Sequence, residues 1–293
     1  MANLRDVRLR MRAIQQTLQV TNAMNLISTA KLRKGRRILE DTEPYYSRIQ
    51  KSMLDILSGA RMDKSKYLLP GNKASARSAI LVITSDKGLA GGYNAGIIRH
   101  VNELCARVSN PVLILIGSIG YRHFIHSPFL ILENFSFKSQ LPDLDNAKEI
   151  AEYVISQYLW GMFSEVHIVY THMYSSIKLL PREQQLLPLN EKRMHEEFEK
   201  SGQKRVDLRF EYVPSKEEVF DVLVPLYIKG IIYCSLVEAY VSEQSARMSA
   251  MNEASKNAEE MLNGLQIHYN RVRQAGITQE MTEIIGGAET LNN

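Results

Sequence analysis

The residues best placed for chemistry form a glycine-rich stretch, Thr84–Asn94, between a predicted buried strand and a predicted helix. Such a turn can hold backbone N–H groups and a helix N-terminus around a phosphate group. Its three glycines, however, fit neither G-x-G-x-x-G nor G-x-x-x-x-G-K-[ST]. The spacing therefore favours a structural role, a tight turn with close helix packing, over nucleotide binding. In that interpretation Asp86 and Lys87 are a helix cap and a surface charge.

Other residue types that catalyse reactions or bind metals are scattered. Cys105 and Cys234 lie far apart with no ligand pattern beside them, which indicates neither a disulfide framework nor a zinc site. Four histidines share no helical face and have no paired carboxylates at metal-ligand spacing: His123, His126, His167 and His172. Nothing places a nucleophile, a base and an oxyanion hole together. We predict no catalytic residue, no metal and no cofactor.

Basic side chains are the more informative charges. One group lies near the N-terminus, and a denser run follows at Lys31, Arg33, Lys34, Arg36 and Arg37. A solvated helix face is the simplest interpretation of such a run, and contact with an acidic partner is the functional one. The formal net charge of +4 is small and the run contains no aromatic residues, so we expect a protein partner and not nucleic acid.

Two long helices must position these charges. Apolar residues recur at steps of three and four over Leu4–Ala60 and again over Ser215–Ala288. This repeat predicts left-handed supercoiling, and two seams of equal length predict that the helices pair antiparallel. Aligning the seams end to end places Asn25 near Ser255. Pro44 is expected to bend or break the first helix.

The middle of the chain alternates between strand and helix patterns. The prediction is an α/β protein with domains at residues 1–60, 75–214 and 215–288: a long antiparallel coiled coil of the two termini with a Rossmann-like α/β domain inserted between them. Pro181 makes its strand an antiparallel edge strand. The expected strands are Ala79–Thr84, Pro111–Ile116, Val166–Thr171, Ile177–Leu189 and Val206–Val213.

Three blocks of residues resemble one known family, the γ subunit of F-type ATP synthase: Ile14–Lys34, Ser85–Asn94 and Ala246–Ala258, the last continued by Tyr269–Ile284. The resemblance implies a non-catalytic rotor shaft of the central stalk. The coiled coil would lie inside a ring of three α and three β subunits. The α/β domain would lie beside the ε subunit and the membrane ring of c subunits, the c-ring.

In that family catalysis belongs to the β subunits, and rotation of the shaft couples ion translocation to ATP synthesis or hydrolysis. The resemblance therefore implies a peripheral protein at the cytoplasmic face of a bacterial cell membrane, attached to the membrane only through the complex. The sequence itself has no run of about 18 apolar residues and no apolar signal core at its start, which agrees with that expectation.

The resemblance also implies roles for single positions. Arg273, Gln274 and Thr278 match residues that meet a β-subunit loop near the upper shaft. Met24 and Arg247 match a pair near the polar level of the coil, where coupling is sensitive. The run from Lys31 to Arg37 is similar to a basic patch that faces the acidic lower segment of β. The sequence departs from the family pattern at Asn22 and Asn25, where charges are common, and at Gly276, where Ser or Ala is usual.

Two further interpretations stay open at this point. A self-associating coiled coil would make the chain a stand-alone scaffold or filament protein. Nucleotide binding at Ser85–Asn94 would make it an enzyme.

Overall fold

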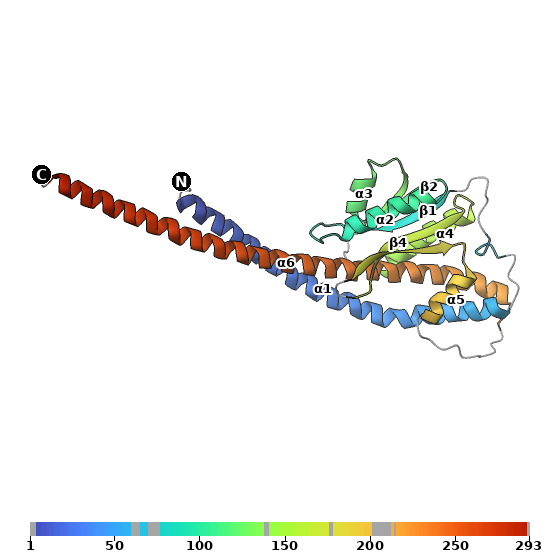
Figure 1. The fold of residues 1–293 in the computed structure, drawn as a ribbon. Coiled ribbons are helices and arrows are strands. Elements are labelled where there is room, and N and C mark those ends of the chain that lie inside the picture. The colour runs from blue at the N-terminus through green and yellow to red at the C-terminus, as the bar shows by residue number, and fades with distance from the viewer. Residues whose placement is uncertain are drawn as a thin grey trace. The chain divides into compact units, whose positions relative to one another are not determined.

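The computed structural model describes residues 4–59, 65–69, 77–137, 141–175, 178–200, 212–213 and 215–291. It contains two compact units: a helical unit made of Met1–Thr29 with Arg247–Asn293, and an α/β unit made of Ala30–Ala246. Two long helices, α1 (Leu4–Gly59) and α6 (Lys216–Leu291), each contribute to both units (Figure 1).

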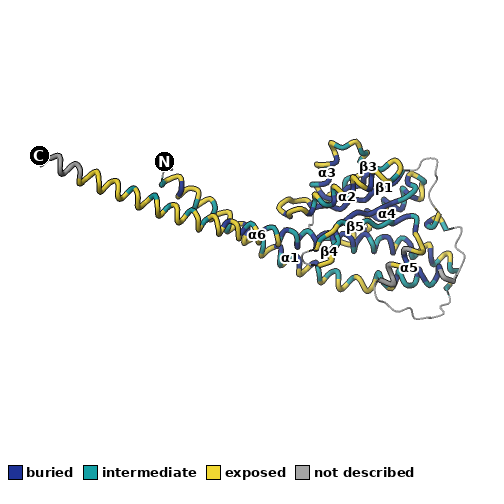
Figure 2. The backbone as a smooth tube through the Cα atoms, in the orientation of Figure 1, coloured by how far each residue is buried: buried dark blue, intermediate teal, exposed yellow. Residues whose placement is uncertain are grey.

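In the helical unit the two helices pair antiparallel. Only one stripe of each helix is covered, because each has a single partner, and most other positions are exposed (Figure 2). The covered positions follow the predicted steps of three and four, which is the pattern of a two-helix seam. The buried members are Val7, Thr21 and Ser28 from α1, and Arg247, Met251, Ser255 and Ala258 from α6.

The α/β unit is built on a five-stranded sheet in the order β3-β2-β1-β4-β5. Parallel pairing joins the first four strands, and β5 is an antiparallel edge strand, as Pro181 predicted. The continuous apolar run of the central strand is buried along its whole length, as parallel strands covered on both faces are. The strands are β1 (Ser78–Ile83), β2 (Pro111–Ile116), β3 (Leu130–Phe135), β4 (Glu165–Met173) and β5 (Leu179–Leu187).

Helices cover both faces of this sheet. Val169 on β4 belongs to the apolar core formed with α2 (Tyr93–Arg107) and α3 (Ser118–Phe124). The next residue, Tyr170, points to the opposite face, because side chains alternate along a strand, and its hydroxyl group hydrogen-bonds with Ser235 and Glu238 of α6. The remaining helices are α4 (Leu144–Leu159) and α5 (Glu191–Lys200).

This architecture confirms the predicted fold class, and it differs from the sequence analysis in detail. Helix α1 runs through Pro44 without a break. Pro44 and Glu40 are both exposed, so the carbonyl group that the proline leaves without a donor can bind water. Strand β3 was not predicted. Residues 206–211 of the last predicted strand lie outside the described residues, and the three domain boundaries stay predictions.

Helix α6 also contains an 18-residue window apolar enough, by length and composition, to cross a membrane. Half of that window is buried inside the protein. Core helices of soluble proteins pass the same test, so the window is weak support for a membrane span.

Candidate functional site: an interaction surface on the long helices

A pair of buried hydroxyl groups marks the polar level of the helical unit. Ser255 Oγ donates a hydrogen bond to Thr21 Oγ1 at 2.7 Å, and Thr21 Oγ1 donates to the Leu18 carbonyl oxygen at 3.1 Å. Both side chains are less than a tenth exposed. A buried polar pair of this kind weakens a seam slightly but fixes its register, because any shift leaves a hydroxyl group without a partner.

The predicted register was wrong by one helical turn. Thr21, and not Asn25, lies opposite Ser255. In the α/β unit the same two helices meet where small residues face large ones. Added Cβ atoms would lie 2.7 Å from Val241 Cγ2 at Gly35 and 1.9 Å from Tyr46 Cδ1 at Gly230. Small-to-large contacts of this kind fix the register there, whereas the ends of the two apolar seams do not.

Met24 and Arg247 both lie in the helical unit, but at different levels. Met24 is half-buried, and Arg247 is only 7% exposed. The observed register sets Met24 opposite Asn252 and Arg247 opposite Thr29, which separates the two levels by more than one turn. A charged group buried this deeply is stable only with partners, which makes Arg247 sensitive to any change in the packing around it.

Arg273, Gln274 and Thr278 lie together near the end of α6 and are all exposed. Thr278 Oγ1 donates to the Gln274 carbonyl oxygen at 3.0 Å, a local bond that leaves the surface of the helix open. The register places Leu4, the first described residue of α1, opposite Val272. Beyond that level α6 therefore has no counterpart from the described part of α1.

A cluster of arginines near this end was not predicted as a site. Arg8 donates to the Tyr269 hydroxyl group at 2.6 Å, and its guanidinium carbon lies 5.6 Å from the centre of the Tyr269 ring. An open hollow of about 720 Å³ surrounds this contact. Four arginines line it: Arg5, Arg8, Arg12 and Arg273. The crowding of arginines near the N-terminus was the available signal, but pairing them with Arg273 required the register.

Large apolar side chains on the outside of the helical unit are a second feature of this surface. Contiguous exposed apolar patches on a folded protein mark contacts with other proteins or with membranes. The side chains, each about half exposed or more, are Leu9, Val20, Leu26, Ile27, Met261, Ile267, Ile277, Met281, Ile284 and Ile285.

The side chains of the basic run Lys31–Arg37 in the α/β unit point in two directions. Gly35 is buried against α6, and Arg36 is half-buried, donating to Met173 Sδ at 3.8 Å. Lys31 is also half-buried. Arg33, Lys34 and Arg37 are exposed, and their spacing puts them on one helical face. The outward-facing part of the run is thus three cations.

The glycine-rich turn is tight, with a φ of +55° at Gly91, but the expected close helix packing was wrong for Gly88 and Gly92, where an added Cβ would meet nothing within 4 Å. Asn94 accepts from the Ser85 N–H at 3.1 Å and donates to Ser85 Oγ at 2.7 Å. Asp86 accepts from both the N–H and the hydroxyl group of Ser118 at 3.0 Å, so it caps the start of α3. These polar groups are occupied by the turn itself.

Helix α6 also occupies the place at which a sheet of this type binds ligands. Ligands of open α/β sheets bind at the carboxyl ends of the strands, where the strand order reverses, which here is beside β1. The remaining cavity measures about 80 Å³. It is lined by Thr84 and Gly117 from the strand ends and by Leu236, Tyr240 and Glu243 from α6.

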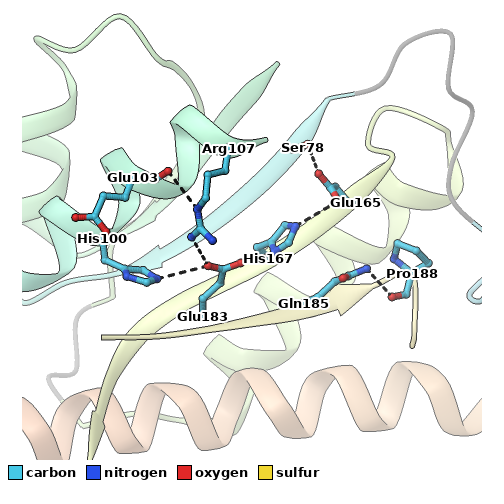
Figure 3. Close-up of polar contacts among 9 residues, drawn as sticks. All are labelled: Ser78, His100, Glu103, Arg107, Glu165, His167, Glu183, Gln185 and Pro188. Carbon is cyan, nitrogen blue, oxygen red and sulfur yellow. Dashed lines mark hydrogen bonds and ion pairs between the residues drawn. The ribbon is translucent and has the colours of Figure 1, made fainter. Parts of the chain in front are cut away.

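A network of polar side chains links the edge strand β5 to β4 and α2, as Figure 3 shows. His167 Nδ1 lies 3.4 Å from Glu183 Oε1, and its Nε2 lies 3.4 Å from Glu165 Oε2. Glu183 also pairs with Arg107 at 2.8 Å and with His100 at 3.5 Å. The network joins β4, β5 and α2. Within the described residues no group of three or more His, Cys, Asp or Glu could hold a metal ion.

Comparison with known proteins gives the family. A sequence model described as ATP synthase matches residues 3–291. The ATP synthase gamma chain of Acetivibrio thermocellus is 42% identical over 294 residues, which cover 99% of this chain and 100% of that one. The sodium ion specific ATP synthase gamma chain of Acetobacterium woodii is 36% identical over 301 residues and 99% of each chain.

Solved structures agree on the fold. A chain of Euglena gracilis mitochondrial ATP synthase superposes with a TM-score of 0.65 at 15% identity, over 98% of this chain and 94% of that chain. A chain from the central stalk and c-ring of the Tetrahymena thermophila mitochondrial ATP synthase has a TM-score of 0.58 at 24% identity, over 80% and 99%. The chain therefore belongs to the ATP synthase family, among the gamma chains.

Proposed function

We propose that this chain is the central-stalk rotor of an F-type ATP synthase and has no catalytic site of its own. It transmits rotation between the membrane c-ring and the catalytic β subunits, and so couples ion translocation to ATP synthesis or hydrolysis. The observation that carries the proposal is the match to gamma chains over the full length. The antiparallel pair of long helices supplies the shaft.

An asymmetric surface is what such a shaft needs. Coupling requires that the shaft bind the conformations of its three β neighbours unequally, since a ligand shifts an equilibrium only by its differential affinity. In the helical unit, the described part of α6 continues past the start of α1, so one side of the pair differs from the other. The exposed apolar side chains there provide the packing against a surrounding ring of α and β subunits.

The charged surfaces fit acidic partners. We assign Arg273, Gln274 and Thr278 to contact with a β-subunit loop, and the exposed residues of the Lys31–Arg37 run to an acidic segment of β. Met24 and Arg247 mark two neighbouring levels of the seam at which changes affect coupling. The arginine hollow around Tyr269 extends the cationic surface from Arg273 to the start of α1.

A non-catalytic role is supported by what fills the sheet. The crevice that would receive a nucleotide holds the chain's own α6, and the glycine-rich turn uses its polar groups on Ser85, Asn94 and Ser118. We place the protein at the cytoplasmic face of a bacterial membrane, with the α/β unit toward the ε subunit and the c-ring.

Reversible arrest tests this function. Thr278→Cys would be crosslinked to a cysteine placed in the facing β loop, in a complex purified with α and β subunits. We expect MgATP hydrolysis to stop on oxidation and to return on reduction. Thr278→Cys alone, oxidised in a complex without the β cysteine, is the control. Continued multi-site hydrolysis by the crosslinked complex would contradict the proposal.

A further inference from the structure

Three polar contacts, one from α2 and two from β4, hold the Ser235–Ala246 segment of α6. The Tyr93 hydroxyl group, at the start of α2, donates to the Ala239 carbonyl oxygen at 3.1 Å. Ser242 Oγ donates to the carbonyl oxygen of Thr171 on β4 at 2.9 Å. Glu238 Oε2 lies 2.8 Å from Nδ1 of His172, also on β4.

The contacts of Tyr93 and Ser242 are buried, whereas the side chains of the Glu238–His172 pair are each about a fifth exposed. Tyr93, Ala239 and Ser242 are each at most 6% exposed, so water does not compete for their hydrogen bonds. Two of the three contacts end on carbonyl oxygens, which cannot rotate away as a side chain can. The Tyr170 hydroxyl group adds hydrogen bonds to Ser235 and Glu238. A cavity of about 80 Å³ lies beside Leu236, Ala239 and Tyr240, and an open hollow of about 770 Å³ between α1, β4, β5 and α6 reaches Ser235 and Glu238.

We propose that this set of contacts, the α6 clamp, is where rotation of the α/β unit is transmitted to the shaft through α6. The α6 clamp consists of Tyr93, Thr171, His172, Glu238, Ala239 and Ser242. The crevice in which sheets of this type bind ligands thus holds the chain's own helix α6. The inference rests on the proposed rotor function and assigns Tyr93, Glu238 and Ser242 as positioning residues.

The packing of α1 in the α/β unit links this helix to α6. Gly35 of α1 lies against Val241 and Tyr240, and Tyr46 lies against Gly230, so α1 packs closely on α6 itself. All residues of α6 from Tyr227 to Ser245 are buried or half-buried. Helix α6 therefore connects the sheet to α1, and the contact of Arg36 with Met173 is a second, direct link between α1 and β4.

Torsional stiffness tests the clamp. The triple variant Tyr93→Phe, Glu238→Gln, Ser242→Ala removes two buried hydrogen bonds and the charge of Glu238 while nearly keeping the side-chain volumes. A bead would be attached to His126→Cys on the α/β unit, or to Val222→Cys on α6, both exposed positions. Angular fluctuation would be recorded in a stalled complex with α and β subunits. For the His126→Cys bead we expect roughly a two-fold rise in angular variance, since each lost buried hydrogen bond loosens the grip, and no rise for the Val222→Cys bead.

A matched triple variant, Tyr158→Phe, Ser127→Ala, Glu183→Gln, removes the same residue types from contacts that do not reach α6. It should leave both variances unchanged. Equal variance in the clamp variant and the wild type at the His126→Cys bead would overturn the inference, and so would an equal rise in the matched variant or at the Val222→Cys bead. A wild-type complex in which ATP drives no rotation would instead contradict the proposed function.

Discussion

The buried hydroxyl pair Thr21–Ser255 gives the sharpest test of how the two helices fit together. Thr21→Val removes the acceptor and leaves the Ser255 hydroxyl group buried without a partner. Ser255→Ala removes the donor, while Thr21 keeps its own bond to the Leu18 carbonyl oxygen. The double variant leaves neither hydroxyl group. The two single changes should therefore not add.

The magnitudes follow from which group is left unpaired. An unsatisfied buried donor costs ~1–3 kcal/mol, so Thr21→Val should lower the free energy of unfolding by about 2 kcal/mol. Ser255→Ala should cost about 1 kcal/mol, the net value of one hydrogen bond. In the double variant the orphaned donor is gone, so the coupling energy should be about 1 kcal/mol.

Urea unfolding of the full chain, followed by far-ultraviolet circular dichroism, would give the four free energies of this cycle. A parallel cycle of Asn25→Val with Ser255→Ala is the matched control, because the structure sets Asn25 one turn away from Ser255. Coupling in the Asn25 cycle and none in the Thr21 cycle would refute the observed register and restore the alignment expected from the seam ends.

Three further perturbations follow from the packing and the charges. Gly230→Ala puts a methyl group 1.9 Å from Tyr46 Cδ1 and should lower the free energy of unfolding by ~1–3 kcal/mol through overpacking. The methyl group of Gly264→Ala meets nothing within 4 Å, so this change should raise the free energy of unfolding by about 1 kcal/mol. Urea midpoints that move in the opposite directions would contradict both expectations. Burial, with the charges of Glu238 and Glu43, raises the pKa of Cys234 to about 12. The thiol of the native protein should therefore react with a disulfide reagent more slowly than the thiol of the unfolded protein. The stability that this thiol contributes should fall as the pH rises from the ordinary pKa of a thiol toward 12. Met24→Lys puts a charge into the half-buried seam and should lower ion pumping per ATP, with Met24→Leu as control; an unchanged ratio would refute a role for this level in coupling.

Most of the fold could be predicted from periodicity. Apolar steps of three and four located both long helices, and short apolar runs located four of the five strands of the sheet, since each element buries one repeating face. Strand β3 was missed because its apolar run, Phe129–Leu132, is short and is followed by Glu133 and Asn134; as an edge strand it is only partly buried. Pro44 was given too much weight, because a proline on a solvent-facing side of a helix leaves its orphaned carbonyl group to water.

The contacts between elements were beyond local patterns. The helix register depends on Gly35 and Gly230 receiving large side chains, and two glycines in a sequence do not say which tyrosine they face. The pairing of Arg8 with Tyr269, and of His172 with Glu238, joins residues far apart in the chain. The basic run was visible as charge, but only the helix geometry separates its outward cations from Arg36.

Rotation of the chain inside a complex tests the central claim most directly. A bead attached at His126→Cys, in a complex with immobilised α and β subunits, would be observed while MgATP is hydrolysed. A rotor shaft predicts continuous rotation in one direction, with a rate that follows ATP concentration. Sustained hydrolysis at the full rate with a bead that only fluctuates about one angle would contradict it.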